Sequence, residues 1–150
     1  AREGIRQMRG SSVRSAIVSA IEGITPGSMA SKRDRFRELK QGYREQHTPR
    51  DRLFALRMSV PPGRSQELIT TDLYVVEFDL AIFYADAPGD LVEDRIAHDC
   101  EQVVRRLESL PSEQTQLEKI DTIPGTVDEM DGIVSAVYTL IVNYRLTGVS

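Results

Sequence analysis

Apolar residues recur at helical spacing in two segments of the chain. In residues 12–24 and again in residues 91–110 they fall three and four positions apart, which is typical of a helix with one buried face. Pro26 is expected to end the first helix, because proline has no backbone N–H to donate. Asp90 and Glu93 have the spacing of a capping box and predict the start of the second helix.

Elsewhere apolar and polar residues alternate, which predicts strands with one buried face. The last strand has the most firmly set register, because apolar side chains occupy seven successive alternate positions from Val134 to Leu146. Two of the strands are longer than the usual length of about 5–6 residues. The predicted strands are residues 53–60, 73–84, 117–123 and 133–146.

The segments between these elements are polar. Pro61 and Gly63 are expected to end the first strand, and the tract around Asp128 is interpreted as an acidic loop. Residues 28–52 match neither period well, so only a short helix around residues 30–42 is predicted there. A connection of this length in a compact domain is usually functional or disordered.

The predicted order of elements is therefore α-β-β-α-β-β. Two helices with one apolar stripe each can cover one face of a sheet, so the predicted fold class is α+β, in two layers, with a mainly antiparallel sheet of about four strands. The same order is a circular permutation of the ferredoxin-like βαββαβ unit. We interpret residues 1–150 as one domain with a basic extended segment at residues 28–52. Exposed sheet edges are natural sites for strand addition from another subunit.

Charge changes this picture most in the first third of the chain. Residues 1–52 contain twelve basic and six acidic residues, whereas residues 53–150 contain seven basic and seventeen acidic ones, for a net charge of −4. Residues 31–52 alone hold eight Lys or Arg and four Asp or Glu. A basic segment joined to an acidic remainder predicts a surface that meets a partner.

Composition narrows the class of protein. A single cysteine, Cys100, excludes an intrachain disulfide framework and a zinc site built from several cysteines. No apolar run approaches the roughly 20 residues of a membrane span, and no hydrophobic block marks a secretory signal. We therefore expect a soluble, intracellular protein with no membrane partner.

The strongest candidate for chemistry lies on the second predicted helix. Asp94 and His98 are four residues apart and can meet on one face, with Asp99 and Glu101 beside them, but a metal site would need a third ligand from elsewhere. The spacing matches no ligand motif, so a solvated helix face is the favoured interpretation. Cys100 is assigned to the core, and no catalytic, metal-binding or cofactor-binding residue is expected.

The basic segment has three interpretations, and all of them stay open. Its charges pair locally, or it contacts nucleic acid, or it forms an interface with an acidic patch on a like subunit. In the third case, a head-to-tail contact that closes produces a ring. The residues proposed for this interface are Arg33, Arg35, Arg37, Lys40, Arg44, Arg50 and Arg52 on the basic side and Asp128, Glu129 and Asp131 on the acidic side.

The local sequences of several elements, taken in order, resemble those of a known family. They are the first helix with its exit from Val13 to Pro26, the strand ending Ile82-Phe83-Tyr84, the helix with Ile96, Asp99 and Leu107, and the final strand closing on Val142-Asn143-Tyr144-Arg145. These features are similar to the tail terminator proteins of tailed bacteriophages, the minor tail protein U-like and tail-completion family. The resemblance covers most of the chain.

This resemblance implies a small α+β subunit of a hexameric ring. Such a ring caps the finished tail tube, stops its polymerisation and joins the tail to the head. The implied partners are further copies of the chain, the tail tube protein and a head-side connector or stopper protein, with DNA passing through the lumen. The implied location is the neck of the virion, after assembly in the host cytoplasm, and the family offers no catalytic residues to carry over.

Two alternatives remain beside this hypothesis. The nearest is another neck protein, such as a head-completion or adaptor subunit. The second is a nucleic-acid-binding module that uses residues 31–52. Tight, salt-sensitive DNA binding by an isolated monomer would favour the second alternative.

Overall fold

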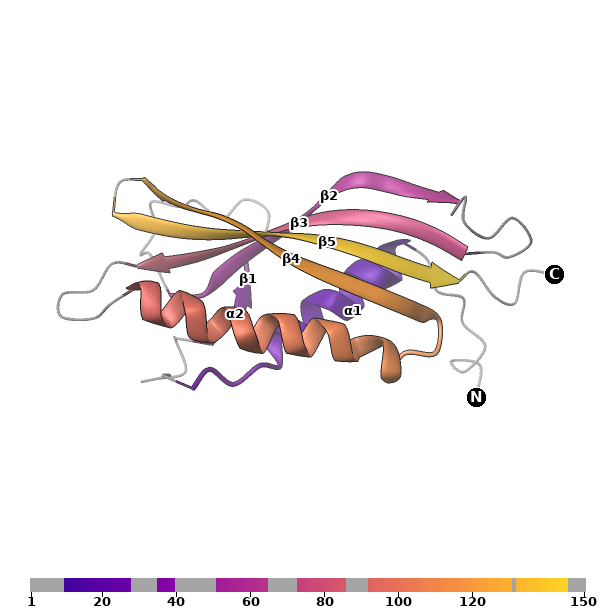
Figure 1. Cartoon of the computed structure of the whole chain (residues 1–150), viewed down its shortest axis with the longest axis horizontal. Coiled ribbons are helices and arrows are strands. Elements are labelled where there is room, and N and C mark those ends of the chain that lie inside the picture. Colours follow the sequence, from indigo (N-terminus) through magenta and orange to yellow (C-terminus); the bar gives the residue numbers. More distant parts are fainter. Residues whose placement is uncertain are drawn as a thin grey trace.

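The computed structural model describes residues 10–27, 35–39, 51–64, 73–85, 92–130 and 132–145, and it confirms the predicted α+β class (Figure 1). Two helices pack on one open, mostly antiparallel sheet of five strands. The elements are α1 (Gly10–Glu22), β1 (Arg37–Glu38), β2 (Leu53–Arg64), β3 (Leu73–Ala85), α2 (Val92–Ser109), the 3-10 turn η3 (Leu110–Ser112), β4 (Leu117–Met130) and β5 (Ile133–Arg145).

The strand order in the sheet is β1-β2-β3-β5-β4. Every neighbouring pair is antiparallel except β1 and β2, which run parallel. Helix α2 joins β3 to β4, and β5 lies between these two strands, as in the split β-α-β arrangement of ferredoxin-like folds. The sheet therefore has two edges, formed by β1 and β2 on one side and by β4 on the other.

The core lies between the sheet and the helices, which occupy the same side of the sheet (Figure 1). Alternate residues of β3 and β5 are buried against the apolar stripes of α1 and α2, as the two sequence periods predict. Burying each large apolar side chain of this kind stabilises the fold by about 1.5–3 kcal/mol. Fully buried members include Ile17, Ile21, Phe78, Leu80, Ile82, Val103, Leu107, Leu140 and Val142.

Strand β2 continues through Pro61, Pro62 and Gly63, so the prediction that these residues end the strand is wrong. The pairing with β3 shifts register between Met58 and Val60 and again between Val60 and Gly63. Proline is tolerated at such a place, because an edge strand uses only one side of its backbone for pairing. The irregular, exposed half of β2 lies beyond the residues that β1 covers.

Strand β4 also extends further than predicted, and the tract around Asp128 is part of this strand, not a loop. Its pairing with β5 resumes at Val127 after a register shift that follows Pro124. Pro124 is paired with Tyr138, as an edge strand allows, and a bulge then absorbs Gly125 and Thr126 before the pairing resumes.

The described part of the basic segment contains a strand where a short helix was predicted. Phe36 is buried, and Arg37 and Leu39 donate backbone hydrogen bonds to the carbonyls of Arg52 (3.1 Å) and Phe54 (2.7 Å). One buried aromatic residue and two backbone bonds to β2 thus prevail over a weak helical pattern. The rest of that predicted helix, and Asp90 of the predicted capping box, lie outside the described residues.

Candidate interaction surface

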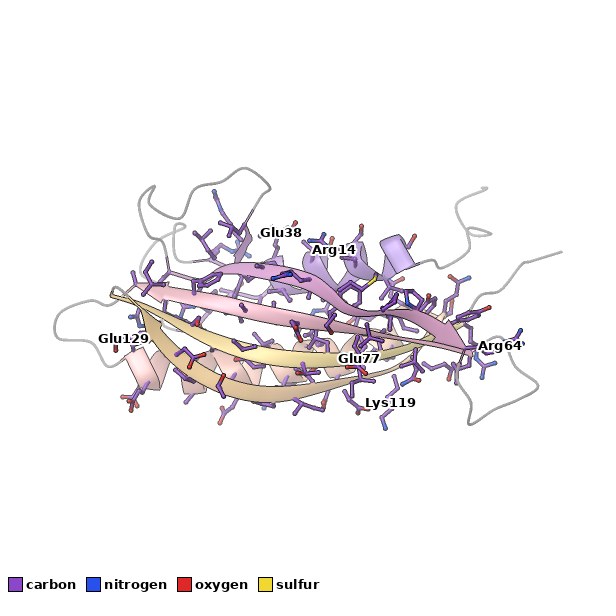
Figure 2. All side chains as sticks on the ribbon, turned by 90° about the horizontal axis from the view of Figure 1, so that it is seen from above. Arg14, Glu38, Arg64, Glu77, Lys119 and Glu129 are labelled. Atoms are coloured by element: carbon purple, nitrogen blue, oxygen red, sulfur yellow. The ribbon has the colours of Figure 1, made fainter. Side chains whose placement is uncertain are left out.

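The helices leave one face of the sheet open, and this face is half apolar (Figure 2). Its residues alternate with the buried ones along each strand, so they come from the odd-numbered positions of β3 and β5. Near β1 the half-buried apolar members gather at one end of the sheet, and they are Leu53, Ala55, Ala81, Phe83, Ile133 and Val137. Charged residues lie towards the middle of the face, where Arg57 is opposite Asp79.

The two edges of the sheet carry opposite charge. Strands β1 and β2 together contain three arginines and one glutamate, whereas β4 contains four acidic residues and one lysine. Figure 2 shows the edges well apart, with Glu38 of β1 at one long side and Lys119 of β4 at the other. Only Arg37 of the basic edge comes from the basic part of the sequence, because Arg57 and Arg64 lie in the acidic remainder.

One row of strand pairing connects the two edges at the same level. Arg37 pairs with Leu53, Leu53 with Phe83, Phe83 with Ser135, and Ser135 with Asp128. Paired residues in neighbouring strands project to the same face, so the side chains of Arg37 and Asp128 both project to the open face. Both are exposed, and neither forms an ion pair with another described residue.

Glutamate side chains occupy edge backbone groups that another strand would need. The backbone N–H of Glu38 in β1 donates to the Glu22 carboxylate at 3.2 Å, and that of Thr122 in β4 donates to the Glu108 carboxylate at 3.4 Å. Arg14 of α1 further donates to the carbonyl of Leu56 at 3.2 Å and pairs with the Glu38 carboxylate. The helices therefore protect both edges with their own side chains.

Prolines and bulges add to this protection. Pro61 and Pro62 in β2 and Pro124 in β4 have no N–H to offer, and both strands are irregular near these residues. The expectation that the edges recruit a strand from another subunit is therefore disfavoured by their local geometry. A partner at either edge would meet side chains more readily than backbone.

Arg52 was predicted to lie in the exposed basic interface, and this prediction is wrong. Its side chain is fully buried and forms two hydrogen bonds with Asp99 of α2, from Nε to Oδ2 at 2.6 Å and from Nη2 to Oδ1 at 3.1 Å. The φ angle of Arg52 is 65°, in the left-handed region that non-glycine residues rarely adopt. Its guanidinium also lies 5.8 Å from the centre of the Phe36 ring.

Tyr84 completes this buried cluster by donating its hydroxyl to Asp99 Oδ2 at 2.9 Å. Burial and the neighbouring Asp99 carboxylate raise the pKa of the Tyr84 phenol, so the hydroxyl keeps its proton at neutral pH. Burial lowers the pKa of the Arg52 guanidinium, but the hydrogen bond and charge of Asp99 outweigh burial and raise it above its ordinary value. The cluster is therefore a charged pair with a neutral donor.

A second ion pair lies next to the first. Asp51 binds Arg95 and also accepts the backbone N–H of Ala85 at 2.8 Å, while Arg95 donates to the carbonyl of Ala85 at 2.9 Å. The consecutive residues Asp51 and Arg52 thus pair with Arg95 and Asp99, which are one helical turn apart on α2. The two pairs fix the start of β2, the end of β3 and α2 to one another.

The helix cluster considered for chemistry is divided by the fold. Asp94, His98 and Glu101 are exposed, as a solvated helix face predicts, but Asp99 is fully buried against Arg52. Within the described residues, no group of three or more His, Cys, Asp or Glu side chains is placed to hold a metal ion. Cys100 packs against the core beside Tyr138, in agreement with its assignment.

The pattern of α2 contained a signal for the buried cluster. Asp99 lies three residues after Ile96 and four before Val103, so it falls on the apolar stripe, where an acidic residue needs a buried partner.

Of the other proposed interface residues, Arg35 is half-buried, and Arg37, Asp128 and Glu129 are exposed. Arg33, Lys40, Arg44, Arg50 and Asp131 lie outside the described residues.

Two comparisons with known proteins found no match to this chain. No protein-family model matches the sequence, and no curated protein matches it. In the described part of the chain, no helix is long and apolar enough to cross a membrane.

Proposed function

We propose that this protein is a structural subunit of a ring that terminates the tail of a bacteriophage or phage-like particle. In this role it caps the tail tube, ends its polymerisation and joins the tail to the head connector. Its partners are further copies of itself, in a ring proposed to be hexameric, together with the tail tube protein and a head-side connector or stopper protein. The proposed location is the neck of the virion.

One observation carries this proposal: a single open sheet has a basic edge and an acidic edge. Such a subunit offers two different surfaces to its copies, and a contact between different surfaces repeats around a ring when the rotation closes. The sequence resemblance to tail terminator proteins supplies the biological setting. The element order that suggested the likeness agrees with the described fold, apart from the added strand β1.

The nucleic-acid alternative loses part of its support from the position of Arg52. A fully buried guanidinium paired with Asp99 cannot reach a phosphate in the folded chain. Within β1, Arg37 is exposed, but Glu38 beside it is held by Arg14. The proposed function therefore assigns the basic segment to a protein contact first.

Assembly and capping can be measured separately. Light scattering and negative-stain imaging of the purified protein should show closed rings. Added to the tail tube protein of the same particle, the rings should shorten the tubes and be seen at their ends. The control is an equal amount of an unrelated ring-forming protein. A strictly monomeric chain that leaves tube length unchanged would contradict the proposal.

A further inference from the structure

We infer that the ring contact is made head to tail between the two sheet edges, with Arg37 of one copy against Asp128 of the next. This inference rests on the proposed function for the existence of a ring, and it goes further by naming the two edges and their register. Arg35 lies two residues before Arg37, just outside β1, and Glu129 follows Asp128 in β4, so a second charge of the same sign lies near each edge. The partner is a second copy of this chain.

The geometry of the sheet places these charges beyond each other's reach within one subunit. Four strand spacings of about 4.8 Å separate β1 from β4, or roughly 19 Å across the sheet. Charges on the surface are screened over about 8 Å at physiological ionic strength. Arg37 and Asp128 are therefore available to a neighbour, not to each other.

The row of paired residues from Arg37 to Asp128 sets the position of the contact along the strands. Because Arg37 and Asp128 stand at opposite ends of one line of paired residues, a neighbour displaced sideways along that line brings its own Asp128 to Arg37. The same displacement brings Arg57, which is level with Ile123, to within two residues of Asp121, and it brings Arg64, which is level with Leu117, next to Glu118. Besides the Arg37 row, the edges therefore place opposite charges close together at these two further levels.

The protected edges determine which groups make the contact. Since Glu22 and Glu108 occupy edge backbone N–H groups and prolines interrupt β2 and β4, a continuous sheet between copies is disfavoured. Side-chain charges remain as the complementary feature. Such charges fix register and reject wrong pairings more than they add affinity.

A contact between two copies of the same edge would be unfavourable. Two β1 edges brought together place arginines near arginines, and two β4 edges place carboxylates near carboxylates. Like charges across an interface are strongly unfavourable. The contact that the charges favour is thus between different edges, which is the kind that builds rings.

The test exchanges charge between the edges. Arg37→Asp places an acidic side chain at both ends of the shared row, and Asp128→Arg places a basic one at both ends. Either variant alone should therefore need at least about tenfold more protein for half-maximal assembly. Mixed in equal amounts, the two variants should assemble again, because alternate copies present opposite charges at every contact. Native mass spectrometry should then find the two variants in equal number in each ring.

Two reversals on the exposed side of α2 serve as controls. Arg105→Asp and Glu101→Arg change charge by the same amount as the edge variants, and they should assemble like the wild type. At a concentration where the wild type and all four variants are monomeric, circular dichroism and the thermal midpoint should be unchanged, because every altered side chain is exposed.

The outcomes separate the two proposals. If the wild type forms rings and the edge reversals assemble as well as the α2 reversals, the assigned edges are wrong while the ring stands. If single reversals disrupt rings but their mixture does not recover, Arg37 and Asp128 do not face each other. If the wild type remains monomeric at every concentration, the proposed function fails, and this contact fails with it.

Discussion

Two consecutive residues just before β2, Asp51 and Arg52, hold the edge of the sheet to α2. Each pairs with an oppositely charged residue one helical turn from the other, Arg95 and Asp99. Buried pairs of this kind contribute little net stability when intact, because desolvation offsets most of the attraction. Removing one partner is costly, since it leaves the other charge buried and alone.

Replacing Asp99 with alanine should therefore lower the free energy of unfolding by about 3–5 kcal/mol. The matched control is Asp94→Ala on the exposed side of the same helix, where the change should stay within about 0.5 kcal/mol. Urea denaturation gives both values. The double variant Arg52→Met with Asp99→Leu should recover much of the loss, because neither charge then remains buried. Equal costs for the two single alanine variants would rule out a structural role for the pair.

The buried phenol of Tyr84 predicts a loss of stability at high pH. Its folded-state pKa is raised above the ordinary value of 10.0, so the folded chain keeps it neutral while the unfolded chain ionises it. The contribution is complete below pH 10.0 and is lost as the pH rises above that value. The slope should be about 1.4 kcal/mol per pH unit for each such tyrosine.

Tyr84→Phe isolates this effect. The variant loses the hydrogen bond to Asp99 at every pH, which lowers its stability by a constant amount, but the slope above pH 10.0 should become shallower. Urea unfolding at several alkaline pH values measures both quantities. Parallel curves for the variant and the wild type would show that Tyr84 is not the titrating group.

At the scale of elements, the sequence pattern correctly predicted the helices and strands that bury one regular face. The stripes of α1 and α2 and the alternation in β3 and β5 were correct, because these elements bury one regular face. The ends of β2 and β4 were wrong, because Pro61, Pro62 and Pro124 end a central strand but not an edge strand. A chain read residue by residue does not reveal which strand will lie at an edge.

Side-chain positions, too, were predictable where local sequence decides them and unpredictable where distant strands do. The exposed state of Arg37, Asp128 and Glu129 could be predicted from composition, but their common level could not, because it depends on the register of four strand pairs. Arg52 was misplaced because its partner lies 47 residues away, a separation that local periodicity does not detect. Asp99, in contrast, could have been assigned to the core from its phase on α2.

The bulge in β4 predicts different effects for two glycines. A Cβ on Gly125 would lie 2.9 Å from the carbonyl oxygen of Val137, and a paired backbone atom cannot move aside cheaply. Gly125→Ala should therefore cost about 1–3 kcal/mol of folding stability. Gly63→Ala in β2 is the matched control, because no atom lies within 4 Å of its Cβ and its stability should be unchanged or slightly higher. Similar unfolding midpoints for both variants would contradict the close approach at the bulge.

At the scale of the whole molecule, the two faces of the sheet have different roles. The helices and the inner face of the sheet form the core, and they leave the open face and both edges to other contacts. The Arg52 and Arg95 ion pairs lie at the same end of the sheet as Arg37, so they steady the backbone on which the basic edge is presented.

Because the two edges of a subunit differ in charge, they also determine which surfaces an incomplete ring leaves exposed. Any open arc of copies, of whatever length, ends in one unoccupied basic edge and one unoccupied acidic edge. Every intermediate can therefore still bind a further copy, and only closure removes both free ends at once. Partial arcs should be scarce beside free subunits and complete rings, and the stopping point is set by the angle between neighbours, not by any change within the subunit.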